Sequence, residues 1–219
     1  MDVTEAITTL RSMRRLKPDP VSDELVRKVL EAAIHAASGG NQQAWAFVVV
    51  RDAEKKRKIA GWYRDGLRLL FESGYGDPRP GDPAPTPEQE AAGERTRRSA
   101  QHLADHMAEV PVLIFACLLG DPSGETRHNA RSGSSIYPAV QNLMLAARAE
   151  GLGTTLTTIH AFHDDELKEL LGIPSHVLTA AMIPMGWPMG RFGAGPRRPV
   201  REVTHIDEWG HPPNWAAGG

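Results

Sequence analysis

Three short stretches of the sequence carry groups that could hold an anionic heterocyclic ligand. Arg11-Ser12-Met13-Arg14 places two guanidinium groups and a hydroxyl together, which suits a phosphate dianion and a second anionic group. Residues 38–43, Ser-Gly-Gly-Asn-Gln-Gln, offer backbone N–H groups and side-chain amides that can pair with a heterocycle edge. Arg197-Arg198 could close on the same phosphate. Each stretch alone is more often solvated surface or a helix end, so it is their joint occurrence that indicates a ligand.

Other motifs of catalytic or metal sites are not supported. The sequence has neither G-x-G-x-x-G nor G-x-x-x-x-G-K-[ST], so neither a dinucleotide fold nor a P-loop is indicated. His102 and His106 have the spacing of metal ligands on a helix, but Leu103 stands where a zincin has glutamate. The favoured interpretation is two histidines on one exposed or lid-facing helix side, and no metal is expected.

The bulk composition is that of an ordinary globular protein. The chain has 219 residues, of which 41% are hydrophobic and 24% charged, enough for one large domain or two small ones. A net charge of −2 argues against non-specific binding to nucleic acids or membranes. Cys117 is the single cysteine and lies in an apolar run, so a buried inert thiol is expected. No signal peptide or membrane-spanning run is visible, and the expected compartment is the cytoplasm.

Alternating helical and strand patterns predict a layered α/β domain that positions the three stretches. The predicted helices cover six stretches: 3–10, 23–37, 53–72, 88–109, 134–150 and 164–171. The predicted strands cover four: 46–51, 112–119, 154–159 and 178–186. Residues 46–51 are apolar enough for a central strand. Ser22 is a typical N-cap, Ser134 or Ser135 would cap the fifth helix after a polar loop over 121–133, and Gly151 would end that helix.

The clearest interruption is GDPRPGDPAPTP, which has five prolines between Asp77 and Pro87. Proline at this density cannot continue a helix or a central strand. A domain linker is one interpretation, but neither flank looks complete alone. We therefore expect a single domain over 1–219 with a lid or surface arm around 73–90.

The order of the motifs resembles the nitroreductase family, which includes relatives of iodotyrosine deiodinase and of the dimethylbenzimidazole synthase. Five motifs carry the resemblance: Arg11-Ser12-Met13-Arg14, AASGGNQQAWAF at 36–47, a helix ending in Gly151-Leu152-Gly153, Pro184-Met185-Gly186-Trp187-Pro188, and Arg197-Arg198-Pro199. Leu10, Ala37 and Ala44 depart from the family pattern. These departures keep the deazaflavin F420 open as an alternative cofactor.

The resemblance implies an α+β fold of three α/β/α layers. Its central sheet would be mixed, mainly antiparallel, of four to five strands flanked by helices, with an extended C-terminal arm. It also implies a homodimer that places FMN at the subunit interface, with no nucleic-acid or membrane partner.

The resemblance assigns roles to residues of the three stretches and of two further segments. Arg11, Ser12 and Arg197 or Arg198 would hold the FMN phosphate. Arg14 would lie near flavin N1 and O2, where a fixed cation stabilises the anionic reduced ring. The pyrimidine side would be lined by the loop after the second helix: Ala37, Ser38, Gly39, Asn41 and Gln43. Thr157 and Thr158 would lie near N5, and no protein acid or base is required. The segment 62–107, with Trp62, Tyr63, Arg64 and the proline-rich arm, would form the substrate lid, and ordinary helix packing is an equal alternative for the aromatic residues.

The implied function is an FMN-dependent oxidoreductase. It would take hydride from NADH or NADPH and reduce a nitroaromatic, a quinone or an activated alkene by a ping-pong mechanism. Two other enzyme functions stay open on the same fold, an F420-dependent reductase and a reductive dehalogenase. Outside enzymes, the alternative is a flavin-binding storage or sensing protein.

Overall fold

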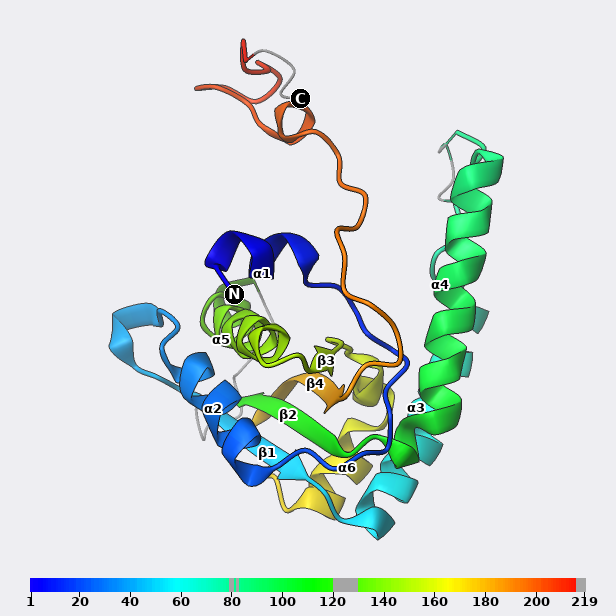
Figure 1. Ribbon diagram of the computed structural model, residues 1–219, viewed down its shortest axis with the longest axis vertical. Coiled ribbons are helices and arrows are strands. Elements are labelled where there is room, and N and C mark those ends of the chain that lie inside the picture. Colours follow the sequence, from blue (N-terminus) through cyan, green and yellow to red (C-terminus); the bar gives the residue numbers. More distant parts are fainter. Residues whose placement is uncertain (79–80, 82, 120–129, 216–219) are drawn as a thin grey trace.

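The fold is built around a four-stranded sheet. A computed structural model of the protein describes residues 1–78, 81, 83–119 and 130–215 (Figure 1). The strands lie in the order β1 (Trp45–Val50), β2 (Val112–Leu118), β4 (Leu178–Gly186) and β3 (Gly153–Thr154). All three neighbouring pairs are antiparallel. In the part of the chain that the structure describes, the sheet is therefore wholly antiparallel, where a mixed, mainly antiparallel sheet was expected. Its four strands are the lower of the two numbers expected.

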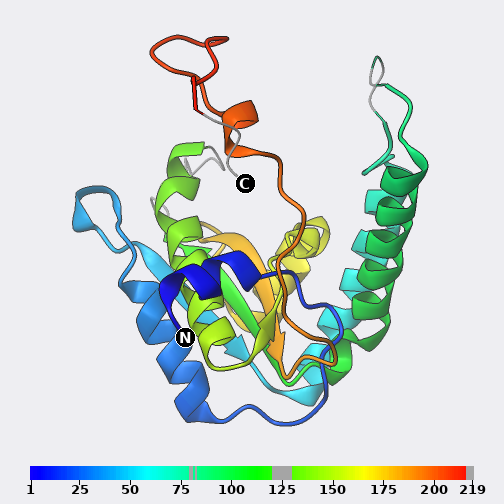
Figure 2. The ribbon, with the colours of Figure 1, turned by 45° about the horizontal axis from the view of Figure 1, so that its top comes forward.

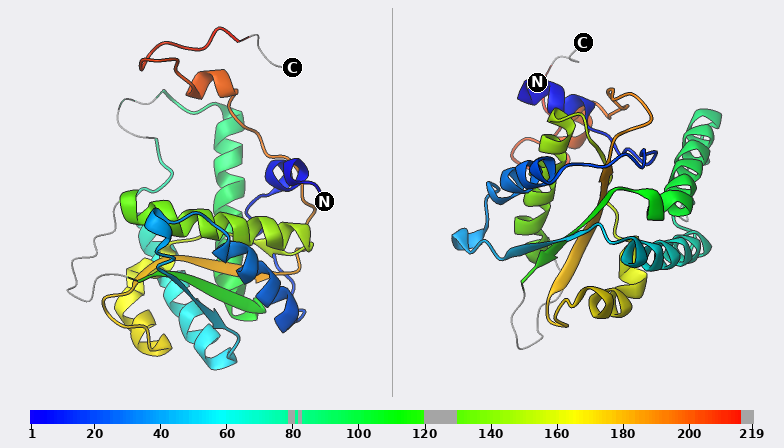
Figure 3. Two further views of the ribbon diagram at one scale, coloured as in Figure 1. Left: turned by 90° about the vertical axis from the view of Figure 1, so that its left-hand side faces the viewer. Right: turned by 60° about the horizontal axis from the view of Figure 1, so that its bottom comes forward.

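Helices cover both faces of this sheet and make three layers (Figure 3). One layer contains α1 (Val3–Thr9), α2 (Asp23–Ile34) and α5 (Ala130–Ala149). The other contains α3 (Ala53–Glu72), α4 (Pro87–His106), the 3-10 helices η2 (Met107–Glu109) and η3 (Ile159–His163), and α6 (Asp164–Leu171). The central strand β2 packs against both helical layers: Phe115 is fully buried in one apolar cluster and Ile114 in the other. The expected α+β fold is confirmed.

Local sequence signals explain most helix ends. The Ser22 hydroxyl accepts a hydrogen bond from the Leu25 N–H at 3.3 Å and caps α2 as predicted. Thr86 and Gln89 form a capping box at the start of α4. Gly151 has φ +78° and ends α5 in a Schellman motif, in which the Leu152 N–H donates to the Ala147 carbonyl at 2.8 Å.

The prediction of a central strand over 46–51 is wrong. The strand β1 lies at one edge of the sheet and pairs only with β2. Its run of valines reflects coverage of both faces, since Val48 packs in one apolar cluster and Val49 in the other. An apolar run reports that both faces are covered and does not report how many strands lie beside it.

The predicted strand over 154–159 is much shorter in the structure. The pairing of β3 with β4 would next match Thr155 with Pro184, and proline has no N–H to donate. Thr157 re-forms a single bridge to Met182. The chain then turns into η3, so the threonine-rich segment lies beside the sheet without extending it.

The predicted serine cap of the fifth helix is also wrong. The helix α5 begins at Ala130, so Ser134 and Ser135 lie inside it. The Ser135 hydroxyl instead accepts a hydrogen bond from the Gly39 N–H at 3.3 Å. The predicted loop over 121–133 is therefore helical from 130 onward, and 121–129 lie outside the described residues.

Two parts of the chain project beyond the sheet. The helices α3 and α4 run side by side past its edge, joined by the proline-rich connection 73–86 (Figures 1 and 2). The C-terminal arm (residues 188–215) leaves the body and carries only the short 3-10 helix η4 (Val200–Val203) (Figure 2). Within the described ranges, no helix combines the length and apolar character needed to cross a membrane. The single domain over 1–219 stays a prediction.

Candidate active site

A cavity of about 470 Å³ lies between α3, α4 and the segment that follows β3. We call it the α3–α4 cavity. It is lined by four of the predicted site residues, which come from three distant parts of the sequence: Arg14, Tyr63, Thr157 and Thr158. Its volume falls within the range of small-molecule sites, about 300–1,000 Å³. This convergence makes the cavity the candidate active site.

Arg14 reaches the cavity because residues 13–17 run alongside the sheet. The Met13 N–H donates to the Thr154 carbonyl at 2.8 Å, and the Lys17 N–H donates to the Trp187 carbonyl at 2.8 Å. Gly153 permits this contact, since an added Cβ there would lie 2.8 Å from the Met13 Cβ. The second glycine of the Gly-Leu-Gly motif thus allows the close approach that fixes the backbone beside Arg14.

The Arg14 side chain is half-buried. It makes no hydrogen bond and no ion pair with any residue that the structure describes. A guanidinium group is charged at all ordinary pH values. The wall of the cavity therefore carries a positive charge that the described part of the chain does not neutralise.

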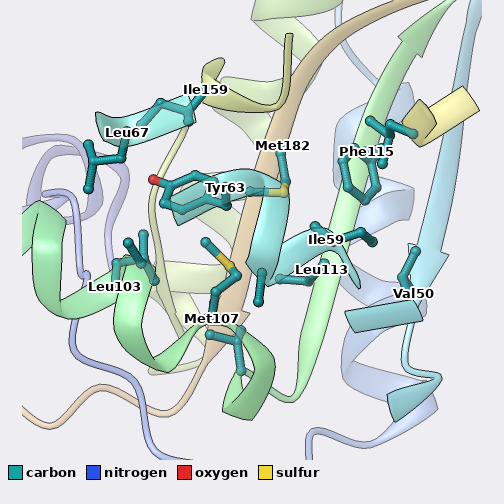
Figure 4. Packing of buried hydrophobic residues seen from close by; sticks show 14 of the residues in the cluster. Val50, Ile59, Tyr63, Leu67, Leu103, Met107, Leu113, Phe115, Ile159 and Met182 are labelled. Carbon is teal, nitrogen blue, oxygen red and sulfur yellow. The ribbon is translucent and has the colours of Figure 1, made fainter. Parts of the chain in front are cut away.

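Tyr63 joins the hydrophobic core to the cavity (Figure 4). Its ring is only 3% exposed and packs among core residues of α3, α4 and the sheet. Its hydroxyl lies 3.3 Å from Thr157 Oγ1. Burial raises the pKa of Tyr63, while the Thr157 hydroxyl and the charge of Arg14 act in the opposite direction. The phenol therefore keeps its proton at neutral pH, and it is both a packing residue and a wall of the cavity.

Thr157 and Thr158 lie where the interrupted strand turns into η3. Two hydrogen bonds with Met182 hold the Thr157 backbone, at 3.0 Å from its N–H and 2.9 Å to its carbonyl. The Ile159 N–H donates to Thr157 Oγ1 at 3.4 Å. The Thr157 side chain is thereby fixed in the wall, while Thr158 is exposed.

The structure does not bring the other two predicted lid residues to the cavity. Trp62 does not line the cavity, and its ring stacks on His163 with 6.3 Å between centroids. Arg64 is exposed and does not line the cavity. Helical geometry explains this outcome, because consecutive residues of a helix face different directions.

Most of the outer wall of the cavity lies within the predicted lid segment 62–107, but the sequence did not single out its individual residues. Six of the side chains come from the end of α3, the connection after it, α4, the segment after β3 and η3: Leu70, Phe71, Tyr75, Arg97, Leu156 and Phe162. Arg97 lies 5.2 Å from the centre of the Phe71 ring. A usable signal was present, since the apolar stripe of α3 continues to Phe71 beyond the length that covers the sheet.

The predicted pyrimidine loop stands elsewhere in the same chain. Residues 37–43 follow α2 and lie on its side of the sheet, away from α3 and α4 (Figures 1 and 3). Gly40, Asn41 and Gln43 all have positive φ, at 57°, 53° and 51°. Within one chain, this loop does not meet the α3–α4 cavity.

Hydrogen bonds within the loop hold its shape. The Gln43 N–H donates to Ser38 Oγ at 3.1 Å, and the Gln43 amide donates to Asn41 Oδ1 at 3.2 Å. The Gly39 N–H contacts Ser135 of α5, as described above. Ala37 and residues 39–43 are exposed. The loop is thus a shaped, solvent-facing surface.

The remaining predicted cofactor residues are also exposed. Arg11 and Ser12 follow α1, and their side chains have no hydrogen-bond partner among the described residues. Arg197 and Arg198 lie on the C-terminal arm, where Arg198 contacts Glu202 at 3.4 Å. One chain alone therefore gathers only Arg14, Tyr63, Thr157 and Thr158 of the predicted set.

The histidine pair of α4 contacts Arg15. The His102 and His106 rings stack with centroids 4.1 Å apart, and Arg15 Nη1 lies 3.4 Å from His102 Nδ1. Burial, and then the charges of Arg15 and His106, lower the pKa of His102. Among the described residues, no three His, Cys, Asp or Glu side chains gather as a metal site would require.

A third histidine, His163, contacts Asp65 on α3, the helix that carries Tyr63. His163 Nε2 lies 2.9 Å from Asp65 Oδ2, and His163 Nδ1 lies 3.4 Å from Glu166 Oε1. Burial acts to lower the pKa of His163, but the two carboxylates outweigh burial and raise it. The pKa of Asp65 is lowered by Arg68 and by His163, and that of Glu166 by its backbone hydrogen bond and by His163.

The contribution of His163 to stability is expected to depend on pH. A raised histidine pKa stabilises the fold fully below about pH 6.5, the value in an unfolded chain, and the effect is lost as pH rises through the folded value. Below about pH 4, protonation of the Asp65 and Glu166 carboxylates removes the partners of His163, so its stabilising effect is lost there as well. The stability difference between wild type and His163→Gln should therefore be larger at pH 5.5 than at pH 8.5 in urea unfolding. An equal difference at both values would contradict the ion-pair assignment.

Fold and site together define an α+β protein with a cationic cavity beside an antiparallel sheet. Comparison with known proteins identifies the family that has this fold. The family model described as "Nitroreductase family" matches residues 7–187. The chain belongs to the nitroreductase family.

Individual relatives extend this result. An NADH dehydrogenase of Thermus thermophilus is 29% identical over 217 residues, covering 93% of this chain and 95% of that protein. Iodotyrosine deiodinase 1 of Rattus norvegicus is 31% identical over 84% of this chain, which spans only 61% of that protein. The fold matches the crystal structure of oxidized iodotyrosine deiodinase bound to FMN and 3-iodo-L-tyrosine, with a TM-score of 0.68 and 22% identity over 90% of this chain and 95% of that one.

Proposed function

We propose that the protein is an NAD(P)H-dependent flavin oxidoreductase that binds FMN beside the α3–α4 cavity. The observation that carries the proposal is the half-buried Arg14 guanidinium, which has no anionic partner among the described residues and lies beside Thr157 and Tyr63. An FMN-bound deiodinase with the same fold and an NADH dehydrogenase relative support the choice of cofactor and donor.

The residues of this chain fit such a cofactor. When bound, FMN supplies hydride transfer between NAD(P)H and an acceptor. Arg14 provides a fixed positive charge for the anionic reduced ring, in a cavity whose apolar walls strengthen electrostatic interactions. The Thr157 backbone and hydroxyl, held by Met182, Ile159 and Tyr63, keep this wall in one position. No side chain has to act as a general acid or base.

We further propose that a second copy of the chain completes the site. The predicted pyrimidine loop and Arg14 lie on different sides of the sheet, so a loop from a partner subunit can cover the cavity while the subunit's own loop cannot. Arg11, Ser12 and Arg197 or Arg198 would then bind the FMN phosphate. Sedimentation velocity should give a dimer of the FMN-loaded protein. A monomer that retains FMN would contradict this arrangement.

The proposed acceptors are nitroaromatics, quinones and activated alkenes, used in turn with NAD(P)H at one cavity. Because each must leave before the other binds, double-reciprocal plots at several acceptor concentrations should be parallel. The first test is the visible spectrum of the purified protein, with mass identification of any released chromophore, followed by NAD(P)H oxidation with menadione. Release of F420 would favour an F420-dependent reductase. Retention of FMN without turnover would favour a flavin-binding storage or sensing protein.

The Arg14→Gln substitution is expected to weaken FMN binding about tenfold to a hundredfold, the effect of losing one charge-assisted hydrogen bond of about 1.5–3 kcal/mol. The reduction potential of the bound flavin should also fall, since the anionic reduced form loses a cation. Fluorescence titration and spectroelectrochemistry measure the two effects. Arg15→Gln is the matched control, because Arg15 is the exposed neighbour that does not line the cavity. Equal behaviour of the two variants would contradict the role of Arg14.

A further inference from the structure

The outer wall of the α3–α4 cavity carries a second guanidinium group, that of Arg97 on α4. It lies 5.2 Å from the centre of the Phe71 ring, and its Nη2 donates to Asp77 Oδ1 at 2.6 Å. Its other N–H groups make no hydrogen bond with any described residue. A guanidinium group has five N–H donors in a fork that matches a carboxylate, so Arg97 can bind a second anion.

The ion pair with Asp77 is weak enough to share or exchange. The side chains of Arg97 and Asp77 are 40% and 58% exposed. Exposed ion pairs of this kind stabilise a protein by only about 0–1 kcal/mol. A ligand carboxylate that is also held by apolar contacts can therefore compete with Asp77 for this group.

The rest of the lining sets the shape and charge of the ligand. Apolar side chains line the same cavity as Arg97, including Leu70, Phe71 and Phe162. Among the described residues, no Asp or Glu lines the cavity. An aromatic ring with a negatively charged substituent matches these apolar walls and the two guanidinium groups, Arg14 and Arg97.

We propose that the electron acceptor of this protein is an aromatic carboxylate that also carries a reducible substituent such as a nitro group, with its carboxylate bound by Arg97 and its ring packed among the apolar side chains of the cavity. This inference rests on the proposed function and specifies its substrate class. Arg14 serves the cofactor and Arg97 serves the acceptor, so the two guanidinium groups have different roles.

Two matched ligand pairs test the inference. In turnover, 4-nitrobenzoate and its methyl ester differ in charge and share the ring, and each nitro group consumes NADH and a proton to give the nitroso compound, NAD⁺ and water. In direct binding, benzoate and benzamide are titrated into the oxidised FMN-loaded protein while the flavin absorbance is recorded. Wild type should favour the carboxylate in both assays.

Three substitutions assign the preference to Arg97. Arg97→Gln should lower kcat/KM for 4-nitrobenzoate and benzoate affinity about tenfold to a hundredfold, with a change below about threefold for the methyl ester and benzamide. Asp77→Asn should leave carboxylate binding equal or tighter, because it removes the competing anion. Arg98→Gln is the control, since Arg98 lies on the same helix, contacts Glu94 at 3.9 Å and does not line the cavity.

The outcomes separate this inference from the proposed function. A wild-type protein that binds FMN and reduces menadione but uses the carboxylate and the ester equally overturns the inference alone. An Arg97→Gln protein with a raised KM for NADH and an unchanged carboxylate preference also overturns it, because Arg97 would then bind the nicotinamide phosphates. Absence of FMN binding and of menadione reduction in wild type would instead overturn the proposed function.

Discussion

The free energy of unfolding of the Gly153→Ala protein should be about 1–3 kcal/mol below that of wild type, the usual effect of overpacking, and the variant should bind FMN less tightly. The added Cβ would lie 2.8 Å from the Met13 Cβ and 3.0 Å from Leu16 Cδ2. The Leu16 methyl can rotate, but the Met13 Cβ is fixed to its backbone, whose N–H is bonded to the Thr154 carbonyl at 2.8 Å. The segment before Arg14 must therefore move away from β3. Urea unfolding measures the stability, and a fluorescence titration measures an expected rise in the FMN dissociation constant of about tenfold.

The matched control is Gly190→Ala. Gly190 lies near the same segment, but its added Cβ would meet only Met13 Cε, at 3.8 Å, an ordinary contact. Its stability should stay within about 0.5 kcal/mol of wild type. If both variants retain wild-type stability and FMN affinity, the close approach at Gly153 does not position Arg14.

The Gly66→Ala substitution should also destabilise the protein by about 1–3 kcal/mol, although alanine is the better helix former. The added Cβ would lie 2.9 Å from both Ile159 Cγ2 and the Ile159 carbonyl oxygen. A backbone oxygen cannot rotate away, so α3 must move from η3 and take the Tyr63 hydroxyl from Thr157. Turnover with menadione should fall together with the melting temperature.

Gly61→Ala on the same helix provides the opposite expectation. No atom lies within 4 Å of an added Cβ at Gly61. Removing a helical glycine there should stabilise the protein by about 0.5–1 kcal/mol. Opposite signs for the same substitution in one helix would show that packing against Ile159 decides the result at Gly66. Stabilisation by both would contradict the packing argument.

The sequence predicted elements well wherever a local signal decides them. Ser22, Gly151 and the prolines before Pro87 act on their own backbone and neighbours, and the corresponding ends lie close to their predicted positions. The errors concern features that depend on a distant partner. The edge position of β1 is decided by strand pairing, and the short β3 is decided by Pro184, nearly 30 residues further along the chain.

The candidate site follows the same division. The family pattern led to Arg14, Thr157 and Thr158, which line one cavity. The predicted lid segment 62–107 contains Arg97 but did not single it out, because one arginine on a polar helix resembles solvated surface until α3 is packed beside it. Of Trp62, Tyr63 and Arg64, only Tyr63 lines the cavity. The orientation of α3 against the sheet decides this, and the sequence alone does not show that orientation.

The N-terminal half of α4 has few contacts with the rest of the protein, which affects how the sequence can change during evolution. Its buried residues, Leu103 and Ala104, lie near its end, whereas residues 87–96 in the first turns of α4 are exposed. Insertions there would leave the core and the groups around Arg14 in place, and doubling the length of a flexible connection costs only about 0.6 kcal/mol. Changes of length in this hairpin can therefore alter acceptor choice over evolution without new solutions for folding or cofactor binding.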